Sequence, residues 1–360
     1  AVKNLGGTFT DIFGNLPSLI AFVPDSVGGI ASVNLTANTF LLTGQDPFFN
    51  ASRDVFFMLY TNDNRNGVRV SIANISCSTF NEANPVRVVI HGYLNRYTSP
   101  VNVLITKAYL DLGNFNVLQS FYETKLSIIF ILRSLLIQSY GADDVSYLNA
   151  RLRVDSVSIQ VALLINGLIS SGSTTYNQIV IVGHSLGGQM AGLTGKKIIG
   201  GKVKAIIAFD PGSLKSIDEV SFFKTFFTYT AGPLFPLQPT TSTVQPTDAE
   251  YVEVIHCNGG GFGMLAPCGQ ADFFPNYGTV QPGCADVLIC PHLRCYDIFA
   301  ESITKINKFV AIKCASYSDI TKTKCVDQGG VYVMGGEPSN TGLSGIFYLK
   351  TYGSSLYAMG

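Results

Sequence analysis

The chain has 360 residues, of which 47% are hydrophobic and 13% are charged, with 24 basic and 24 acidic side chains. A formal net charge of zero gives no field that would attract a phosphate backbone, so we expect no nucleic-acid partner. The high apolar content excludes a disordered chain and favours a large buried core. The longest apolar stretch, residues 126–137, contains Arg133 and is too short to span a bilayer, which predicts a soluble protein.

The cysteines indicate an oxidising compartment. There are eight, and five of them lie between Cys257 and Cys295, a pattern typical of disulfide-bonded secreted proteins. No CxxC pair occurs, so we expect no metal site. Glycosylation sequons begin at Asn34, Asn50 and Asn74, and the first residue is an alanine, as after removal of a signal peptide. We therefore predict a secreted, extracellular glycoprotein.

Short apolar runs alternate with longer helical stretches along the chain. The runs at Val86–Ile90, 179–182 and Ala205–Phe209 are predicted to be buried strands of a parallel sheet. Between the last two, residues 186–200 contain closely spaced small residues and should form a helix packed on the sheet. This strand–helix–strand unit, with no internal repeat elsewhere, predicts a single α/β domain over residues 1–360.

A G-x-S-x-G pentapeptide, residues 183–187, follows the second of these strands. Glycines on both sides of Ser185 allow a sharp turn into the helix, which would expose the serine hydroxyl at the edge of the sheet. The alternative is a glycine-rich turn in which the serine only caps the helix. The position between a strand and a helix favours a nucleophile.

A serine nucleophile needs a histidine base and an acid that orients it, in the chain order serine, acid, histidine. Asp210 directly follows the strand at Ala205–Phe209, so its carboxylate should lie at the same sheet edge as Ser185, although a strand-ending Asp before proline can also be an ordinary turn residue. Two histidines follow. His256 ends an apolar run and should hydrogen-bond locally, whereas His292 lies in a predicted loop, where a mobile base belongs. We favour His292.

The tetrahedral intermediate of ester hydrolysis also needs amide donors for its oxyanion. The amide after the nucleophile belongs to Leu186. A second donor is expected after the strand at Val86–Ile90, where Gly92 permits the amide of Tyr93 to point into the site. His91 precedes the acid in the chain and is interpreted as structural. This chemistry requires no metal and no cofactor.

Several segments together resemble the pancreatic-lipase-like family, most closely its single-domain arthropod members, the insect neutral lipases and wasp-venom phospholipase A1 enzymes. The resemblance covers about residues 50–360 and rests on blocks in family order at residues 57–61, 90–93, 183–188, 248–256, 271–276, 281–284 and 347–351. It implies an α/β-hydrolase fold with a mostly parallel central sheet, helices on both faces and no C-terminal β-sandwich. It also implies that Ser185, Asp210 and His292 are the catalytic residues, that Tyr93 and Leu186 are the oxyanion donors, and that colipase is not a partner.

The resemblance further implies that Cys284 and Cys290 bracket the lid over the active site. Only five residues, 285–289, lie between them, and short lids in the family resemble those of phospholipases. The expected function is therefore hydrolysis of glycerolipid esters at a membrane or lipid surface, most of all the sn-1 ester of phospholipids. The alternatives are a neutral lipase acting on triacylglycerol or galactolipid, and a catalytically silent lipid-binding or yolk-type storage protein.

Two segments depart from the family pattern. A family motif that continues directly after the acid is interrupted here by residues 212–230, and residues 118–138 stand where a strand ending in Val-Asp-Trp is expected. We interpret both as insertions; an intron left in the translated sequence is the alternative to a genuine insertion. An insertion directly after Asp210 could displace the acid.

The spacing of the cysteines suggests local loop staples, although sequence cannot fix the connectivity. The predicted pairs, in order of support, are Cys284–Cys290, Cys314–Cys325, Cys257–Cys268 and, as the remaining two, Cys77–Cys295.

Overall fold

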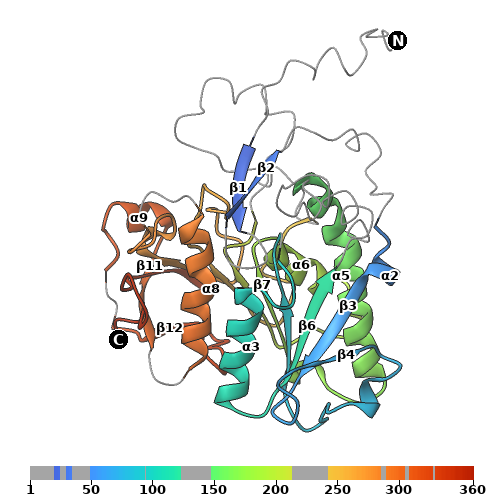
Figure 1. Cartoon of the computed structure of the whole chain (residues 1–360). Helices are drawn as coiled ribbons and strands as arrows, with labels where there is room; N and C mark the ends of the chain where they lie inside the picture. The colour runs from blue at the N-terminus through green and yellow to red at the C-terminus, as the bar shows by residue number, and fades with distance from the viewer. Residues whose placement is uncertain are drawn as a thin grey trace, which may run out of the picture.

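The structure is a computed structural model that describes residues 20–24, 30–34, 49–93, 95–122, 147–212, 242–284, 289–304, 308–326 and 329–360 (Figure 1). Strands from this part of the chain form one large sheet of 11 strands. A separate antiparallel pair joins β1 (Ile20–Pro24) to β2 (Ile30–Asn34). Within the described residues, no helix is both long and apolar enough to cross a membrane.

The middle of the large sheet is parallel, as the sequence predicts. Seven neighbouring strands, from β13 to β6, run in one direction, and antiparallel strands flank them at both edges. In spatial order the strands are β12 (Tyr332–Met334), β11 (Phe309–Cys314), β13 (Gly345–Leu349), β10 (Ala271–Pro275), β9 (Val252–Ile255), β8 (Ala205–Phe209), β7 (Ile179–His184), β5 (Val86–Ile90), β6 (Asn116–Tyr122), β3 (Val55–Tyr60) and β4 (Val68–Val70).

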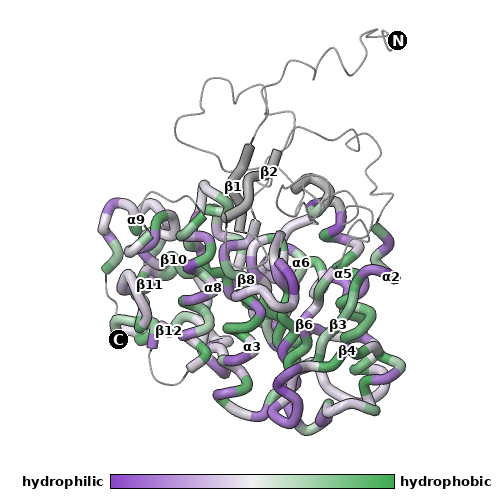
Figure 2. Tube along the Cα trace, in the orientation of Figure 1, coloured by the Kyte–Doolittle hydropathy of each residue, from purple (hydrophilic) through white to green (hydrophobic). Residues whose placement is uncertain are grey.

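Helices cover both faces of this sheet, also as predicted. The β-branched residues of β7 alternate between them. Ile179 and Ile181 pack with α5 (Tyr147–Ser170) and α6 (Leu186–Gly195), whereas Val180 and Val182 pack with α3 (Pro100–Leu112) and α8 (Cys290–Ile303). In Figure 2 much of the strands in the middle of the sheet has the hydrophobic colour. The remaining helical segments are α2 (Ala51–Asp54), α9 (Tyr317–Thr321) and the 3₁₀ turns η2 (Ile75–Cys77), η3 (Tyr176–Gln178) and η6 (Asn276–Gly278).

The apolar residues on each face of the sheet form a hydrophobic core with the helices that cover that face. These two cores explain why the sheet is apolar at its centre. All residues of β5, β7 and β8 are buried, as expected when helices cover both faces of parallel strands. Burying one Val, Ile or Phe side chain stabilises a fold by roughly 1.5–3 kcal/mol. The described residues contain no β-sandwich after β13, and the fold is that of an α/β hydrolase.

Two predicted boundaries are wrong. The helix expected over residues 186–200 ends at Gly195, because the chain then turns through Lys196–Gly200 with Gly200 at φ 84°. The segment 118–138, interpreted as an insertion in place of a missing strand, begins inside a strand. Leu118 to Tyr122 complete β6, which pairs with β5 on one side and β3 on the other. Residues 123–138 lie outside the described part of the chain.

The disulfides correct part of the predicted pairing. Cys284–Cys290 and Cys314–Cys325 are bonded as predicted. Cys257 is not bonded to Cys268 but to Cys295, with a Cα–Cα distance of 5.6 Å. Cys77 and Cys268 are free, one exposed and the other buried. The short spacing between Cys257 and Cys268 suggests a local pair, and this prediction is wrong. Cys257 instead pairs with Cys295 because the fold brings the end of β9 next to α8.

Candidate active site

Ser185 lies in the sharp turn between β7 and α6. Its backbone has φ 58° and ψ −125°, a conformation that is strained for a residue with a side chain. The neighbouring glycines make this turn possible. A Cβ atom on Gly183 would lie 2.1 Å from the Gly187 oxygen, and a Cβ atom on Gly187 would lie 2.1 Å from the Ile90 oxygen. Only glycine fits at either position, so the pentapeptide is a tightly packed strand-to-helix elbow rather than a loose turn.

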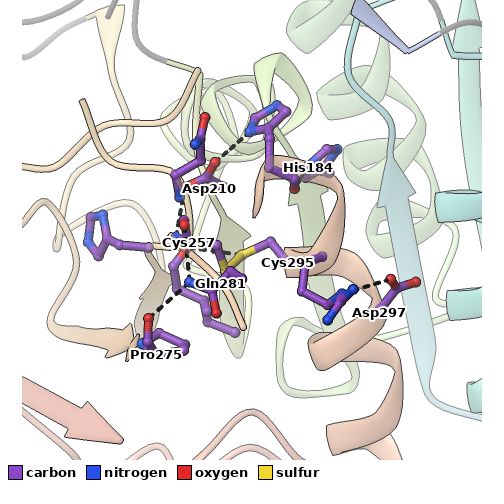
Figure 3. Close-up of a disulfide and its surroundings, with 12 residues drawn as sticks. His184, Asp210, Cys257, Pro275, Gln281, Cys295 and Asp297 are labelled. Carbon is purple, nitrogen blue, oxygen red and sulfur yellow. Dashed lines mark hydrogen bonds and ion pairs between the residues drawn. A yellow bond between two sulfur atoms is a disulfide. The ribbon is translucent and has the colours of Figure 1, made fainter. Parts of the chain in front are cut away.

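Asp210 and His292 form a buried hydrogen-bonded pair. Asp210 directly follows β8, and its Oδ2 accepts a hydrogen bond from His292 Nδ1. Its other oxygen, Oδ1, accepts bonds of 2.8 Å from the amides of Cys257 and Asn258 (Figure 3). Because Nδ1 of His292 is the donor to Asp210, the opposite nitrogen, Nε2, is the one able to accept a proton.

His292 does not lie in a loop, as the sequence suggested, but in the first turn of α8. Pro291, also in that turn, suits a helix start because its missing N–H would have no intrahelical acceptor. Two disulfides hold this end of the helix, Cys284–Cys290 and Cys257–Cys295. The predicted base is therefore carried by a constrained helix, not by a mobile segment.

His184, the residue before the serine, contacts the predicted base. Its Nε2 donates a hydrogen bond of 3.0 Å to the His292 carbonyl oxygen, and the two rings lie 4.5 Å apart. Burial, and secondarily the neighbouring His292, lowers the pKa of His184 well below its usual value. A neutral His184 therefore contacts His292 without adding a second charge. The sequence displayed this residue inside the pentapeptide, but nothing in the pattern marked its partner.

Gly212 and Gly263 connect the serine turn to the acid. The Gly212 amide donates a bond of 2.9 Å to the Ser185 carbonyl oxygen, and Gly212 forms a β-bridge with Gly263. A Cβ atom on Gly263 would lie 2.2 Å from Asp210 Oδ1. Gly212, expected to be the first residue of an insertion, thus belongs to the site. Residues 213–230 lie outside the described part of the chain.

Both predicted oxyanion donors lie on segments that adjoin Ser185. Leu186 begins α6, where the first amides have no intrahelical acceptor and the helix dipole favours negative charge. Before Tyr93, a Cβ atom added to Gly92 would lie 2.7 Å from Ser185 Cβ and 3.3 Å from Ser185 Oγ. Gly92 is therefore packed directly against the serine side chain.

His256, the rival base, is occupied elsewhere. Its Nε2 bonds Asp272 Oδ1 at 3.0 Å and its Nδ1 bonds the Met264 carbonyl oxygen at 2.7 Å. Both ring nitrogens therefore contact oxygen atoms of other residues, and neither contacts Ser185. The ring also stacks on Phe274 at 4.3 Å. His256 hydrogen-bonds locally at a strand end, as its sequence context indicates.

The site combines the parts that acyl transfer requires. A serine lies on a strained turn, a histidine is oriented by a buried carboxylate, and the segments that carry the two predicted donor amides adjoin the serine. The sequence does not predict that the amides of Cys257 and Asn258 donate to Asp210, because nearly every residue type supplies a backbone amide. The loop between Cys284 and Cys290 is described only at Ile289, so the predicted lid at residues 285–288 lies outside the described part.

Comparison with known proteins identifies the family. The Lipase family profile matches residues 38–219 and 229–357. The pancreatic triacylglycerol lipase of Mus musculus is 29% identical over 346 residues, 87% of this chain and 66% of that protein. The human protein of the same name is 28% identical, over 84% of this chain and 64% of its own length. The chain thus spans about two thirds of these relatives, and with matches over most of its length it belongs to the Lipase family.

Proposed function

We propose that this protein is a secreted serine hydrolase that cleaves carboxylic esters of glycerolipids, most of all the sn-1 ester of phospholipids. The observation that carries the proposal is the buried Asp210–His292 pair next to the strained elbow of Ser185. A storage or lipid-binding role puts no demand on a strained serine or on a carboxylate that orients a histidine. The pancreatic lipase relatives support a lipid ester as substrate.

The residues have defined roles in this reaction. Ser185 Oγ attacks the ester carbonyl carbon while His292 Nε2 takes the hydroxyl proton. The carbonyl oxygen of the ester, which carries a negative charge in the tetrahedral intermediate, accepts hydrogen bonds from the amides of Tyr93 and Leu186. The carbon–oxygen bond to the glycerol then breaks, and His292 gives its proton to the departing alcohol. Water, deprotonated by His292, releases the fatty acid from Ser185, and Asp210 stabilises the imidazolium in both halves.

The length of the lid favours phospholipids as substrates. The Cys284–Cys290 disulfide closes a loop with five residues between the two cysteines. So few residues can cover little apolar surface, so the loop should not have to open at a lipid interface before hydrolysis begins. A triacylglycerol lipase is the second candidate, because the relatives reported above carry that name.

The test uses phosphatidylcholine with distinguishable sn-1 and sn-2 chains beside triolein, together with covalent labelling by a fluorophosphonate. We expect sn-1 release and labelling in the wild type and in Ser170→Ala, which changes an exposed serine at the end of α5. Ser185→Ala should lose both, with a rate loss of about 10⁶-fold as in other serine triads. Release from triolein alone would select the second candidate. Folded wild type that neither labels nor releases fatty acid would refute the enzyme.

We further propose that residues 1–360 form one domain and that the inserted segments are 123–138 and 213–230. These limits exclude the parts of the predicted insertions that the structure places in β6 and at Gly212. Deleting residues 213–230 should leave labelling of Ser185 intact.

Secretion is supported by three disulfides. Culture medium of expressing cells should contain the protein, and an endoglycosidase should lower its mass at Asn50 and Asn74, which are exposed.

A further inference from the structure

We propose that His91 is a positioning residue for the oxyanion hole. Its ring holds the Gly92–Tyr93 peptide in the orientation that directs the Tyr93 amide toward the ester bound at Ser185. This inference rests on the proposed function, and it assigns a role to a histidine whose position in the sequence suggests only a structural part.

The peptide in question lies against the nucleophile. The added Cβ of Gly92 would overlap with the Ser185 side chain, as described above, and would also lie 3.1 Å from the His184 carbonyl oxygen. The turn after β5 is therefore in contact with the backbone and the side chain of the elbow. A small rotation of the Gly92–Tyr93 peptide would change the direction of the Tyr93 amide. That amide belongs to the residue directly after Gly92, which contacts Ser185.

His91 bonds the other end of the same peptide. Its Nδ1 donates a hydrogen bond of 2.9 Å to the Gly92 carbonyl oxygen. A trans peptide is planar, and its C=O and N–H groups point in opposite directions. Fixing the Gly92 carbonyl therefore fixes the direction of the Tyr93 N–H. On the far side of Tyr93, Asn95 Nδ2 donates a bond of 2.9 Å to the Tyr93 carbonyl oxygen, so both peptides next to Tyr93 are held.

The bond to Gly92 is the one hydrogen bond that the His91 ring makes within the described residues. His91 is 1% exposed and stacks on Tyr122, with ring centroids 5.1 Å apart and planes at 22°. Its second nitrogen, Nε2, is buried and has no hydrogen-bond partner within the described residues. Burial lowers the pKa of His91 to about 4, so near neutral pH the ring is uncharged and carries its proton on Nδ1. An imidazole buried with one unsatisfied nitrogen is costly, and the bond to Gly92 accounts for its other nitrogen.

A matched pair of substitutions separates the hydrogen bond from the packing. His91→Asn and His91→Leu remove the ring equally and have nearly the same size, but only the asparagine can place an N–H near the former Nδ1 position. Loss of one oxyanion donor costs about 10²–10³ in kcat, and a donor that is misdirected rather than absent should cost about 10- to 100-fold. We expect that loss for His91→Leu with KM within about twofold, and recovery of most of kcat in His91→Asn. Tyr122→Phe, which keeps the stacked ring, should behave as wild type.

A second measurement keeps the inference testable without turnover. Crystal structures of the wild type and His91→Leu should differ in the orientation of the Gly92–Tyr93 peptide, and in wild type the ¹⁵N shifts of His91 should show a protonated, hydrogen-bonded Nδ1. If the two small variants do not fold, His91→Phe keeps a ring and removes the donor. Equal kcat in His91→Asn and His91→Leu, or an unmoved peptide, overturns the inference while the wild type stays active. Wild type that fails to label with a fluorophosphonate refutes the proposed function instead, and the crystal structures still decide whether His91 sets this peptide.

Discussion

The Cys257–Cys295 disulfide joins a residue that hydrogen-bonds Asp210 to the helix that carries His292, and replacing both cysteines with alanine tests that connection. The Cys257 amide donates to Asp210, and Cys295 lies one helical turn after His292 in α8. The bond closes a loop of 38 residues. In the chain-entropy treatment of cross-links, such a loop corresponds to about 4 kcal/mol of unfolding free energy.

The Cys314–Cys325 disulfide is the matched control. It closes a loop of 11 residues, which corresponds to about 3 kcal/mol in the same treatment, and it joins β11 to the segment after α9, away from Ser185. Both double variants should therefore lose stability in urea denaturation.

Only the first should lose activity under conditions where each variant remains folded. A displacement of about 1 Å at a reacting group can reduce the rate roughly 100-fold, so we expect kcat to fall at least tenfold in the Cys257/Cys295 variant. The control should stay within twofold of wild type. Equal activity in the two double variants, measured at saturating ester, would refute the idea that this disulfide sets the acid–base geometry.

Three further outcomes are expected. Asp210→Asn should fold normally and lose about 10⁴ in kcat, because an amide can leave His292 in the wrong tautomer; a loss below tenfold would contradict this role. Gly92→Ala should lose at least about 10² in kcat because its Cβ would overlap with Ser185, whereas Gly113→Ala, whose nearest atom would be 3.6 Å away, should not. Burial raises the pKa of Glu253 to about 7, so the stability present below pH 4.5 should fall by about 3 kcal/mol as pH rises through 7; urea titrations of Glu253→Gln should lack this decline, and parallel curves would refute it.

Much of the sheet could be predicted from sequence because its signal is local. Runs of Val and Ile such as β5 can be buried on both faces only in a covered parallel sheet. The turn at Ser185 was equally readable, because only glycine fits at positions 183 and 187. Chain order then pointed to Asp210 and His292, which the structure joins by a hydrogen bond.

The parts that sequence could not supply depend on contacts between distant segments. The disulfide partner of Cys257 is 38 residues away in the chain. The two cysteines pair because the end of β9 lies next to α8 in the fold. His292 was assigned to a loop because prolines and cysteines usually mark irregular chain, but a proline is also favourable in the first turn of a helix. The roles of His184 and His91 rest on bonds to carbonyl oxygens, which leave no trace in residue type.

The two helix layers give the site a dependence on the whole fold. Ser185 directly precedes α6, which packs in the core on one face of the sheet, whereas His292 lies in α8, which packs in the core on the other face. The two side chains are therefore brought to the same edge of the sheet only after both helices have docked. A nascent chain with one layer in place has half of the pair and cannot form an acyl intermediate. On the proposed function, we expect hydrolysis to begin only when folding is finished.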